Sequence, residues 1–123
     1  MSPTDKKNRF ISIFRRFARS GLGKRGLRAS EAAARIRGAS RDARTREELT
    51  ALYETVRFLR VSGREDVLYA LKRVYLTPKG YHIAKSDISM RVVRCADELH
   101  CDERTVYRYL SYAMRIYERY LII

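Results

Sequence analysis

Apolar residues recur along this chain at the spacing of amphipathic α-helices, and the pattern begins near the N-terminus. In RFISIFRRFARS, residues 9–20, four large apolar side chains follow the i, i+3, i+4, i+7 spacing: Phe10, Ile13, Phe14 and Phe17. Arginines fill other positions, so a short basic amphipathic helix is predicted. GLGKRG, residues 21–26, predicts a flexible break because of its three glycines. A weaker helix is expected in SEAAARIR, ending at Gly38.

Stronger helical signals begin at residue 45. Thr45 and Glu48 form a capping-box pattern ahead of an apolar series, which predicts a helix from about residue 46 to 60. Ser62 and Glu65 repeat the pattern and predict a second helix directly after the first.

The second of these helices is expected to stop at Thr77, because proline follows and disfavours helical geometry in the residue before it. PKGYHIAK, residues 78–85, then predicts a loop or a short extended piece. Ser86 or Asp87 can cap a further helix that runs to Leu99. No segment alternates with the period of a strand, so the sequence predicts an all-α fold.

The segment from Val92 to Ser111 fits a helix-turn-helix, in which two helices cross at a steep angle through a short turn. Ala96 is the small residue needed where the helices approach most closely. His100 is predicted to take the left-handed turn position, which glycine usually occupies. Asp102 is predicted to cap the second helix, because its carboxylate can accept from free backbone N–H groups. The apolar contacts are predicted to be Cys95, Leu99, Cys101, Val106 and Tyr109 or Leu110.

The second helix, from about residue 103 to 121, is predicted to be buried on one side and cationic on the other. At about 100° per residue, the buried stripe comprises Val106, Tyr109, Leu110, Ala113, Ile116, Tyr117 and Tyr120. The outward face comprises Arg104, Arg108, Arg115 and Arg119, with Tyr107 and Ser111 beside them. A solvated charged surface is the simpler explanation, but the position within a helix-turn-helix favours a DNA-reading face.

Each outward side chain suits a particular contact. Arg104 and Arg108 are candidates for base reading, because arginine can donate two parallel hydrogen bonds to guanine in the major groove. Tyr107 can contact a phosphate or a thymine methyl group, and Ser111 a phosphate or a base.

Two arginines further along the helix suit phosphates instead, since Arg115 and Arg119 lie about 16 Å or more from its start. Glu103 can accept from a cytosine amino group or can simply stabilise the helix N-terminus, and the sequence leaves both alternatives open.

Charge is unevenly distributed along the 123 residues. The formal net charge is +13, which indicates a polyanionic partner. Residues 1–44 hold 13 Lys+Arg against 3 Asp+Glu. We therefore predict a basic arm containing the short amphipathic helix, residues 1–44, and a helical helix-turn-helix DNA-binding domain, residues 45–123. The arm is expected to add sequence-independent phosphate contacts and can become ordered on binding.

The two cysteines do not predict a metal or redox site. Cys95 and Cys101 are separated by five residues and fall at apolar positions, where free cysteine behaves as a small hydrophobe. Only His82 and His100 are available as further soft ligands, so we expect no metal and no cofactor. The cysteines are too few for a disulfide framework, and no apolar segment is long enough to span a bilayer. A cytoplasmic location is expected.

Enzymatic activity is not expected. The carboxylates nearest the predicted turn straddle it without forming a ligand set for metal-dependent chemistry on nucleic acids: Asp97, Glu98, Asp102 and Glu103. No Ser/His/Asp or Cys/His arrangement stands out either.

One stretch carries a family resemblance. SDISMRVVRCADELHCDERTVYRYLSYAMRIYERYL follows the helical segments ALYETVRFL and VLYALKRVYL. Together they resemble the C-terminal part of ArpU-type phage late transcription regulators and, more distantly, the helix-turn-helix of sigma-factor region 4. The resemblance covers about residues 50–121 and rests chiefly on ERTVYRYL, while residues 1–44 match no part of it. It implies a small helical promoter-binding protein encoded by a phage or an integrated element.

The leading hypothesis is a sequence-specific transcriptional regulator that binds double-stranded DNA and no membrane. The sequence leaves open the operator, the sign of regulation, any contact with RNA polymerase, and homodimer formation through the apolar end YLII. The alternative is a basic structural protein that binds RNA or a membrane surface through residues 8–44. RFISIFRRFAR can lie on anionic lipid, and an arginine-rich, acid-poor start also resembles an organellar transit peptide.

Overall fold

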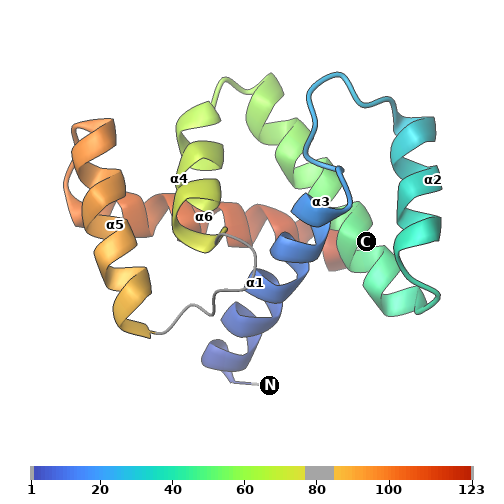
Figure 1. Ribbon diagram of the computed structural model, residues 1–123, viewed down its shortest axis with the longest axis horizontal. Coiled ribbons are helices and arrows are strands. Elements are labelled where there is room, and N and C mark those ends of the chain that lie inside the picture. Colours follow the sequence, from blue (N-terminus) through green and yellow to red (C-terminus); the bar gives the residue numbers. More distant parts are fainter. Residues whose placement is uncertain (1, 77–84, 123) are drawn as a thin grey trace. The chain divides into compact units, whose positions relative to one another are not determined.

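The computed structural model describes residues 2–76 and 85–122, and over these residues the chain forms helices and no strand. The helices, labelled in Figure 1, are α1 (Pro3–Arg19), α2 (Ala29–Ala39), α3 (Ala43–Val61), α4 (Glu65–Tyr75), α5 (Lys85–Leu99) and α6 (Glu103–Ile122). The predicted all-α fold class is therefore confirmed. The loop predicted over residues 78–85 lies outside the described residues, except for Lys85, which begins α5.

Contacts divide the chain into two compact units. We call residues 1–58 and 117–123 the N-terminal unit, and residues 59–116 the central unit. Helices α3 and α6 contribute residues to both. This division by contacts differs from the predicted boundary between residues 44 and 45, which stays a prediction. The physical reason is that the apolar side chains of the basic segment are part of the core of the N-terminal unit.

Helix α1 carries those apolar side chains. It begins at Pro3, earlier than the apolar pattern predicts, because Ser2 caps it: the Ser2 hydroxyl accepts from the backbone N–H of Asp5 at 3.1 Å. Proline suits this first position because its missing N–H would have no partner there. The four predicted apolar residues, Phe10, Ile13, Phe14 and Phe17, are each only 2–3% exposed. The rings of Phe10 and Tyr117 pack with their centroids 5.1 Å apart.

A buried carboxylate joins three helices in the N-terminal unit. Glu48 of α3 is 1% exposed, and it accepts from Arg9 Nε at 3.0 Å and from Arg9 Nη2 at 2.5 Å. The hydroxyl of Tyr117, in α6, donates to the same carboxylate at 3.4 Å. Burial, and then the nearby Glu48 charge, raise the pKa of Tyr117. These partners offset the cost of burying the Glu48 carboxylate.

The capping box predicted at Thr45 is wrong. The cap of α3 is Asp42, whose Oδ2 accepts from Thr45 N at 3.1 Å and from Thr45 Oγ1 at 2.7 Å. Glu48 cannot return to the helix start because its carboxylate is held in the core. Sequence spacing alone does not distinguish a capping glutamate from a buried one.

The central unit is built around α4 and α5, which pack against each other. Its most deeply buried side chains include Val67, Leu71, Val74, Val92, Cys95, Val106 and Ala113, all 0% exposed. Arg73 Nε, on α4, contacts Glu98 Oε1, on α5, at 2.8 Å. Arg91 Nη1, on α5, donates to Leu76 O at 2.5 Å, just after α4. Both contacts join the C-terminal end of α4 to α5.

The second capping box, at Ser62 and Glu65, is also wrong. Gly63, with φ +72°, ends α3 in the left-handed conformation that glycine adopts easily. Ser62 Oγ donates back to Leu59 O at 3.4 Å, and the residue before α4 is Arg64, which makes no side-chain cap.

The sequence also predicted where α4 ends and which residue caps α5. Helix α4 ends at Tyr75, close to the predicted stop. Helix α5 begins at Lys85, so Ser86 and Asp87, which the sequence predicted as possible caps, lie inside its first turn.

Candidate nucleic-acid interface

The connection between α5 and α6 is a short turn with a defined backbone. His100 N donates to Asp97 O at 3.2 Å, and Cys101 N donates to Ala96 O at 3.0 Å. This pair of bonds is the Schellman motif of a helix C-terminus. His100 has φ +55°, so it occupies the left-handed position predicted for it. Histidine is one of the commoner non-glycine residues in that conformation.

Asp102 caps α6, as predicted. Its Oδ1 accepts from Thr105 N at 2.7 Å and from Thr105 Oγ1 at 2.9 Å. These bonds, with smaller contributions from Arg104 and Arg108, hold the pKa of Asp102 below its usual value. The helix therefore starts at a fixed residue, which sets the direction of each side chain that follows.

The buried side of α6 largely follows the predicted stripe. In the central unit, Val106 and Ala113 are 0% exposed, and Leu110 and Ile116 are also buried. Tyr117 is buried in the N-terminal unit. Tyr109 and Tyr120 are only half-buried, which corrects their place in the predicted core.

A cluster at the start of α4 contacts the flank of α6. The guanidinium carbon of Arg64 lies 5.4 Å from the ring centroids of both Tyr109 and Tyr112. Arg64 Nε also pairs with Asp66 Oδ1 at 3.1 Å, and the Asp66 carboxylate lies near the Tyr109 hydroxyl. Burial, followed by Asp66, raises the pKa of Tyr109. Sequence patterns did not predict this cluster, because its members are far apart along the chain.

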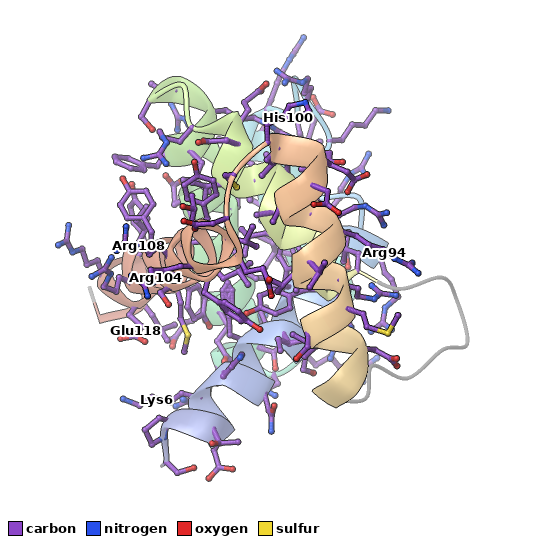
Figure 2. All side chains as sticks on the ribbon, turned by 90° about the vertical axis from the view of Figure 1, so that its left-hand side faces the viewer. Lys6, Arg94, His100, Arg104, Arg108 and Glu118 are labelled. Atoms are coloured by element: carbon purple, nitrogen blue, oxygen red, sulfur yellow. The ribbon has the colours of Figure 1, made fainter. Side chains whose placement is uncertain are left out.

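The predicted DNA-binding residues lie on the exposed side of α6. Arg104, Tyr107, Arg108, Ser111 and Arg115 are all exposed in the central unit, Tyr107 with 40% of its surface accessible. Figure 2 shows Arg104 and Arg108 on the side of α6 that faces away from α5, whereas Arg94 extends from the far side of α5. Arg119 is exposed too, but it belongs to the part of α6 in the N-terminal unit.

The arginines of this face are available to an external partner. Within residues 2–76 and 85–122, no ion pair joins Arg104, Arg108 or Arg115 to an acidic side chain. Glu103 is exposed in the first turn of α6, the position where a negative charge favours a helix. We call Arg104, Tyr107, Arg108, Ser111 and Arg115 the α6 face.

The cysteines contribute to packing. Cys95 is buried, Cys101 is half-buried, and both are free thiols. Burial raises the pKa of each thiol, which disfavours the reactive thiolate. In the described part of the chain, no group of three or more His, Cys, Asp or Glu side chains is arranged to hold a metal ion.

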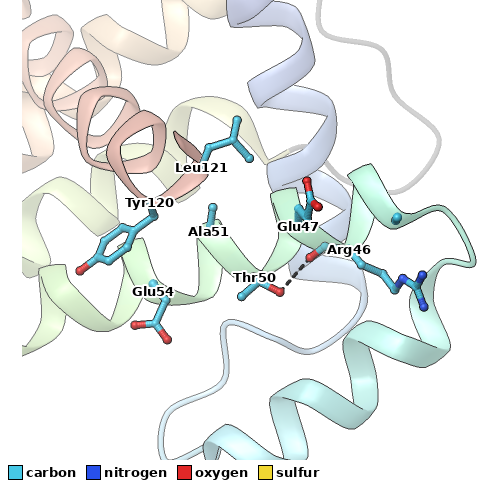
Figure 3. A pocket seen from close by; sticks show the side chains of 8 residues that line it. Arg46, Glu47, Thr50, Ala51, Glu54, Tyr120 and Leu121 are labelled. Carbon is cyan, nitrogen blue, oxygen red and sulfur yellow. Dashed lines mark hydrogen bonds between the residues drawn. The ribbon is translucent and has the colours of Figure 1, made fainter. Parts of the chain in front are cut away.

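A groove of about 760 Å³ in the N-terminal unit, shown in Figure 3, lies between α3 and the end of α6. Its lining comprises Ala43, Arg46, Glu47, Thr50, Ala51, Glu54, Tyr120 and Leu121. Thr50 Oγ1 is bonded to Arg46 O at 2.8 Å. The lining holds neither histidine nor cysteine, the side chains that most often serve as a general base or a thiol nucleophile.

The amphipathic helix near the N-terminus does not present an apolar surface. The phenyl rings of α1 are buried in the N-terminal unit. Among the helices described, none combines the length and the apolar character needed to cross a bilayer. Comparisons of this chain with protein-family models, with curated proteins and with solved structures found no match.

Proposed function

We propose that this protein is a sequence-specific transcriptional regulator that places α6 in the major groove of duplex DNA. The observation that carries the proposal is the α6 face: exposed arginines on a helix whose opposite side is buried and whose start is fixed by Asp102. A major groove admits one α-helix, and residues near its N-terminal end reach the base edges. The α5–turn–α6 segment would then act as a helix-turn-helix.

The proposed contacts differ along α6. Arg104 and Arg108, about one turn apart at the helix start, would donate to guanine O6 and N7. Tyr107 and Ser111 would contact a phosphate or a base beside them. Arg115 lies about 16 Å along the axis from Arg104, so it would contact the phosphate backbone, and Arg119 would extend these backbone contacts.

The resemblance of ERTVYRYL to ArpU-type regulators is consistent with this division. This run covers residues 103–110 and includes the exposed Arg104, Tyr107 and Arg108 together with the buried Val106 and Leu110. The same eight residues thus supply part of the core and part of the α6 face. Because ERTVYRYL resembles these phage regulators, we propose a phage or mobile-element origin for the protein.

Of the alternative, an RNA- or membrane-surface-binding protein acting through residues 8–44, the membrane-surface form receives less support. Insertion into a lipid interface requires an exposed apolar helix face. In α1 that face comprises Phe10, Phe14 and Phe17, which are 2–3% exposed. Binding to lipid through α1 would therefore require the N-terminal unit to open.

The test begins with in vitro selection of bound duplexes from a random pool. Arg104→Ala and Arg108→Ala are then compared with Arg115→Ala and Arg119→Ala by competition between the selected duplex and a scrambled one. We expect each of the first two variants to lose about 1 to 3 kcal/mol on the selected duplex and to discriminate less at one or two base pairs. The other two should weaken binding to both duplexes alike and lower the salt slope by about one unit each.

The matched control is Arg94→Ala, which removes one exposed positive charge from α5, away from the α6 face. It should leave discrimination unchanged. Equal losses on both duplexes for all four α6 variants, or a random pool that yields no preferred sequence, would reject sequence-specific recognition by α6.

A further inference from the structure

The glycine-rich segment between α1 and α2 is held in place at both ends. At its start, Gly21 has φ +72°, and Leu22 N donates to Phe17 O at 3.3 Å. The Leu22 side chain is 1% exposed, so it anchors the segment in the core of the N-terminal unit. At the other end, the carbonyl of Leu27 accepts from the Tyr53 hydroxyl at 3.0 Å. The flexible break predicted from the glycines is thus a loop with fixed ends, running beside α3 (Figure 1).

The loop is cationic and exposed between these anchors and at the residue directly after the second one. Lys24, Arg25 and Arg28, which we call the loop cations, are all exposed. Arg28 Nε lies 3.7 Å from Glu31 Oε1, but both side chains are largely accessible, so the pair adds little and leaves Arg28 able to exchange partners. No Asp or Glu occurs from residue 6 to residue 30, where nine Lys and Arg are found. Residues 6–30 therefore carry a formal charge of +9, which favours an anionic partner.

The shape of the loop allows a large anion to approach its backbone. A Cβ placed at Gly26 would meet no atom within 4 Å, so solvent lies next to this residue. Gly23, by contrast, lies over the Phe17 ring, because a Cβ placed there would be only 3.3 Å from Phe17 Cε1. The loop therefore packs against the core at Gly23, while the space beside Gly26 is open and the loop cations are exposed to solvent.

We infer that the loop cations form a second, sequence-independent binding site, whose ligand is the phosphodiester backbone of duplex DNA. This inference rests on the proposed function for the choice of duplex DNA over other polyanions. A membrane surface fits less well, because the exposed part of the loop offers no large apolar side chain for insertion, and Leu22 is buried. Each cation that meets a phosphate releases a condensed counterion, so the site would strengthen binding to any DNA sequence.

The test uses the full chain with Lys24→Ala, Arg25→Ala and Arg28→Ala combined. Its control combines Lys6→Ala, Lys7→Ala and Arg57→Ala, which also removes three exposed positive charges from the N-terminal unit. Binding to a random duplex is measured at several salt concentrations. We expect the loop variant to lower the slope of log K against log salt by about 2 to 3 units, and the control by less than one. Thermal melting must first show that both variants fold, and glutamine replaces alanine if the loop variant does not.

The outcomes separate this inference from the proposed function. If the loop variant keeps the wild-type salt slope, or loses no more than the control, the loop site is rejected, whatever the α6 variants do. If the loop variant loses its slope while the α6 variants show no change in discrimination, the loop site stands and sequence-specific reading by α6 fails. Tighter loop-dependent binding to vesicles of phosphatidylserine and phosphatidylcholine than to duplex DNA would also overturn the inference.

Discussion

Ala96 is a buried small residue of α5 next to the turn that precedes α6. It is 4% exposed, and its carbonyl accepts the hydrogen bond from Cys101 that closes the Schellman motif. Ala96→Leu would force three additional carbon atoms into this enclosed position. We expect the free energy of unfolding to fall by about 1 to 3 kcal/mol, as measured by urea denaturation.

The matched control for this substitution is Ala34→Leu, which makes the same change at an exposed position of α2. It should alter the free energy of unfolding by no more than about 0.5 kcal/mol. If Ala96→Leu were as stable as the unsubstituted protein, the packing around Ala96 would be looser than a close crossing of two helices requires.

At the scale of helices, periodicity predicted which segments are helical, but the cap predictions had mixed outcomes: Asp102 caps α6 as predicted, whereas the capping boxes expected at α3 and α4 are wrong. The apolar series of α1, α3, α4 and α6 determined their buried sides, because burying a stripe requires only the right spacing. Caps depend on which nearby polar side chain reaches the free N–H groups. At α3, Asp42 reaches Thr45 N, while the core retains Glu48. At α4, the left-handed Gly63 decides where the chain turns.

For the candidate site, periodicity likewise predicted which side chains are exposed, but not the contacts between distant parts of the chain. Arg104, Arg108 and Arg115 are exposed because they lie opposite the buried stripe of a strongly amphipathic helix. The Arg64 cluster and the anchored loop at residues 21–27 depend on contacts between distant parts of the chain, such as that of Tyr53 with Leu27. Local patterns carry no information about such contacts.

The cap of α6 gives a prediction about pH. The bonds from Thr105 lower the pKa of Asp102, so the cap contributes stability above the unfolded pKa of about 3.9 and loses it as the pH falls through the lowered value. Asp102→Ala should therefore have a lower urea midpoint than the unsubstituted protein at pH 7, and the difference should shrink below about pH 4.

Asp102→Asn is the control, because asparagine also caps helices but does not titrate. The urea midpoint of Asp102→Asn should stay above that of Asp102→Ala at both pH 7 and pH 2.5. A difference between Asp102→Ala and the unsubstituted protein that does not change between pH 7 and pH 2.5 would show that the charged carboxylate is not the stabilising group.

For the molecule as a whole, the basic N-terminal segment, residues 1–44, both carries charge and supplies side chains to a core. The sequence predicted it as a basic arm outside the helical domain. Its arginines and lysines contribute most of the net charge, while its phenylalanines belong to the core of the N-terminal unit. Arg9 serves in both respects, since it is a cation of this segment and the partner of the buried Glu48. Removing the segment to test phosphate binding would therefore also remove part of the core.

We accordingly expect deletion of residues 1–44 to unfold the N-terminal unit rather than merely to weaken DNA binding. The deletion removes Phe10, Phe14 and Phe17 from the core and leaves Glu48 without Arg9. Losing one buried phenylalanine side chain costs about 3 to 5 kcal/mol, and the total stability of a domain is only about 5 to 15 kcal/mol.

Circular dichroism during heating should show that residues 45–123 lose helix without the cooperative transition of the full chain. The loop variant, which removes charge but no core side chain, should melt like the unsubstituted protein. If residues 45–123 instead melted cooperatively at the temperature of the full chain, the first 44 residues would be a separable arm, and their buried phenyl rings would contribute nothing to the stability of the remaining helices.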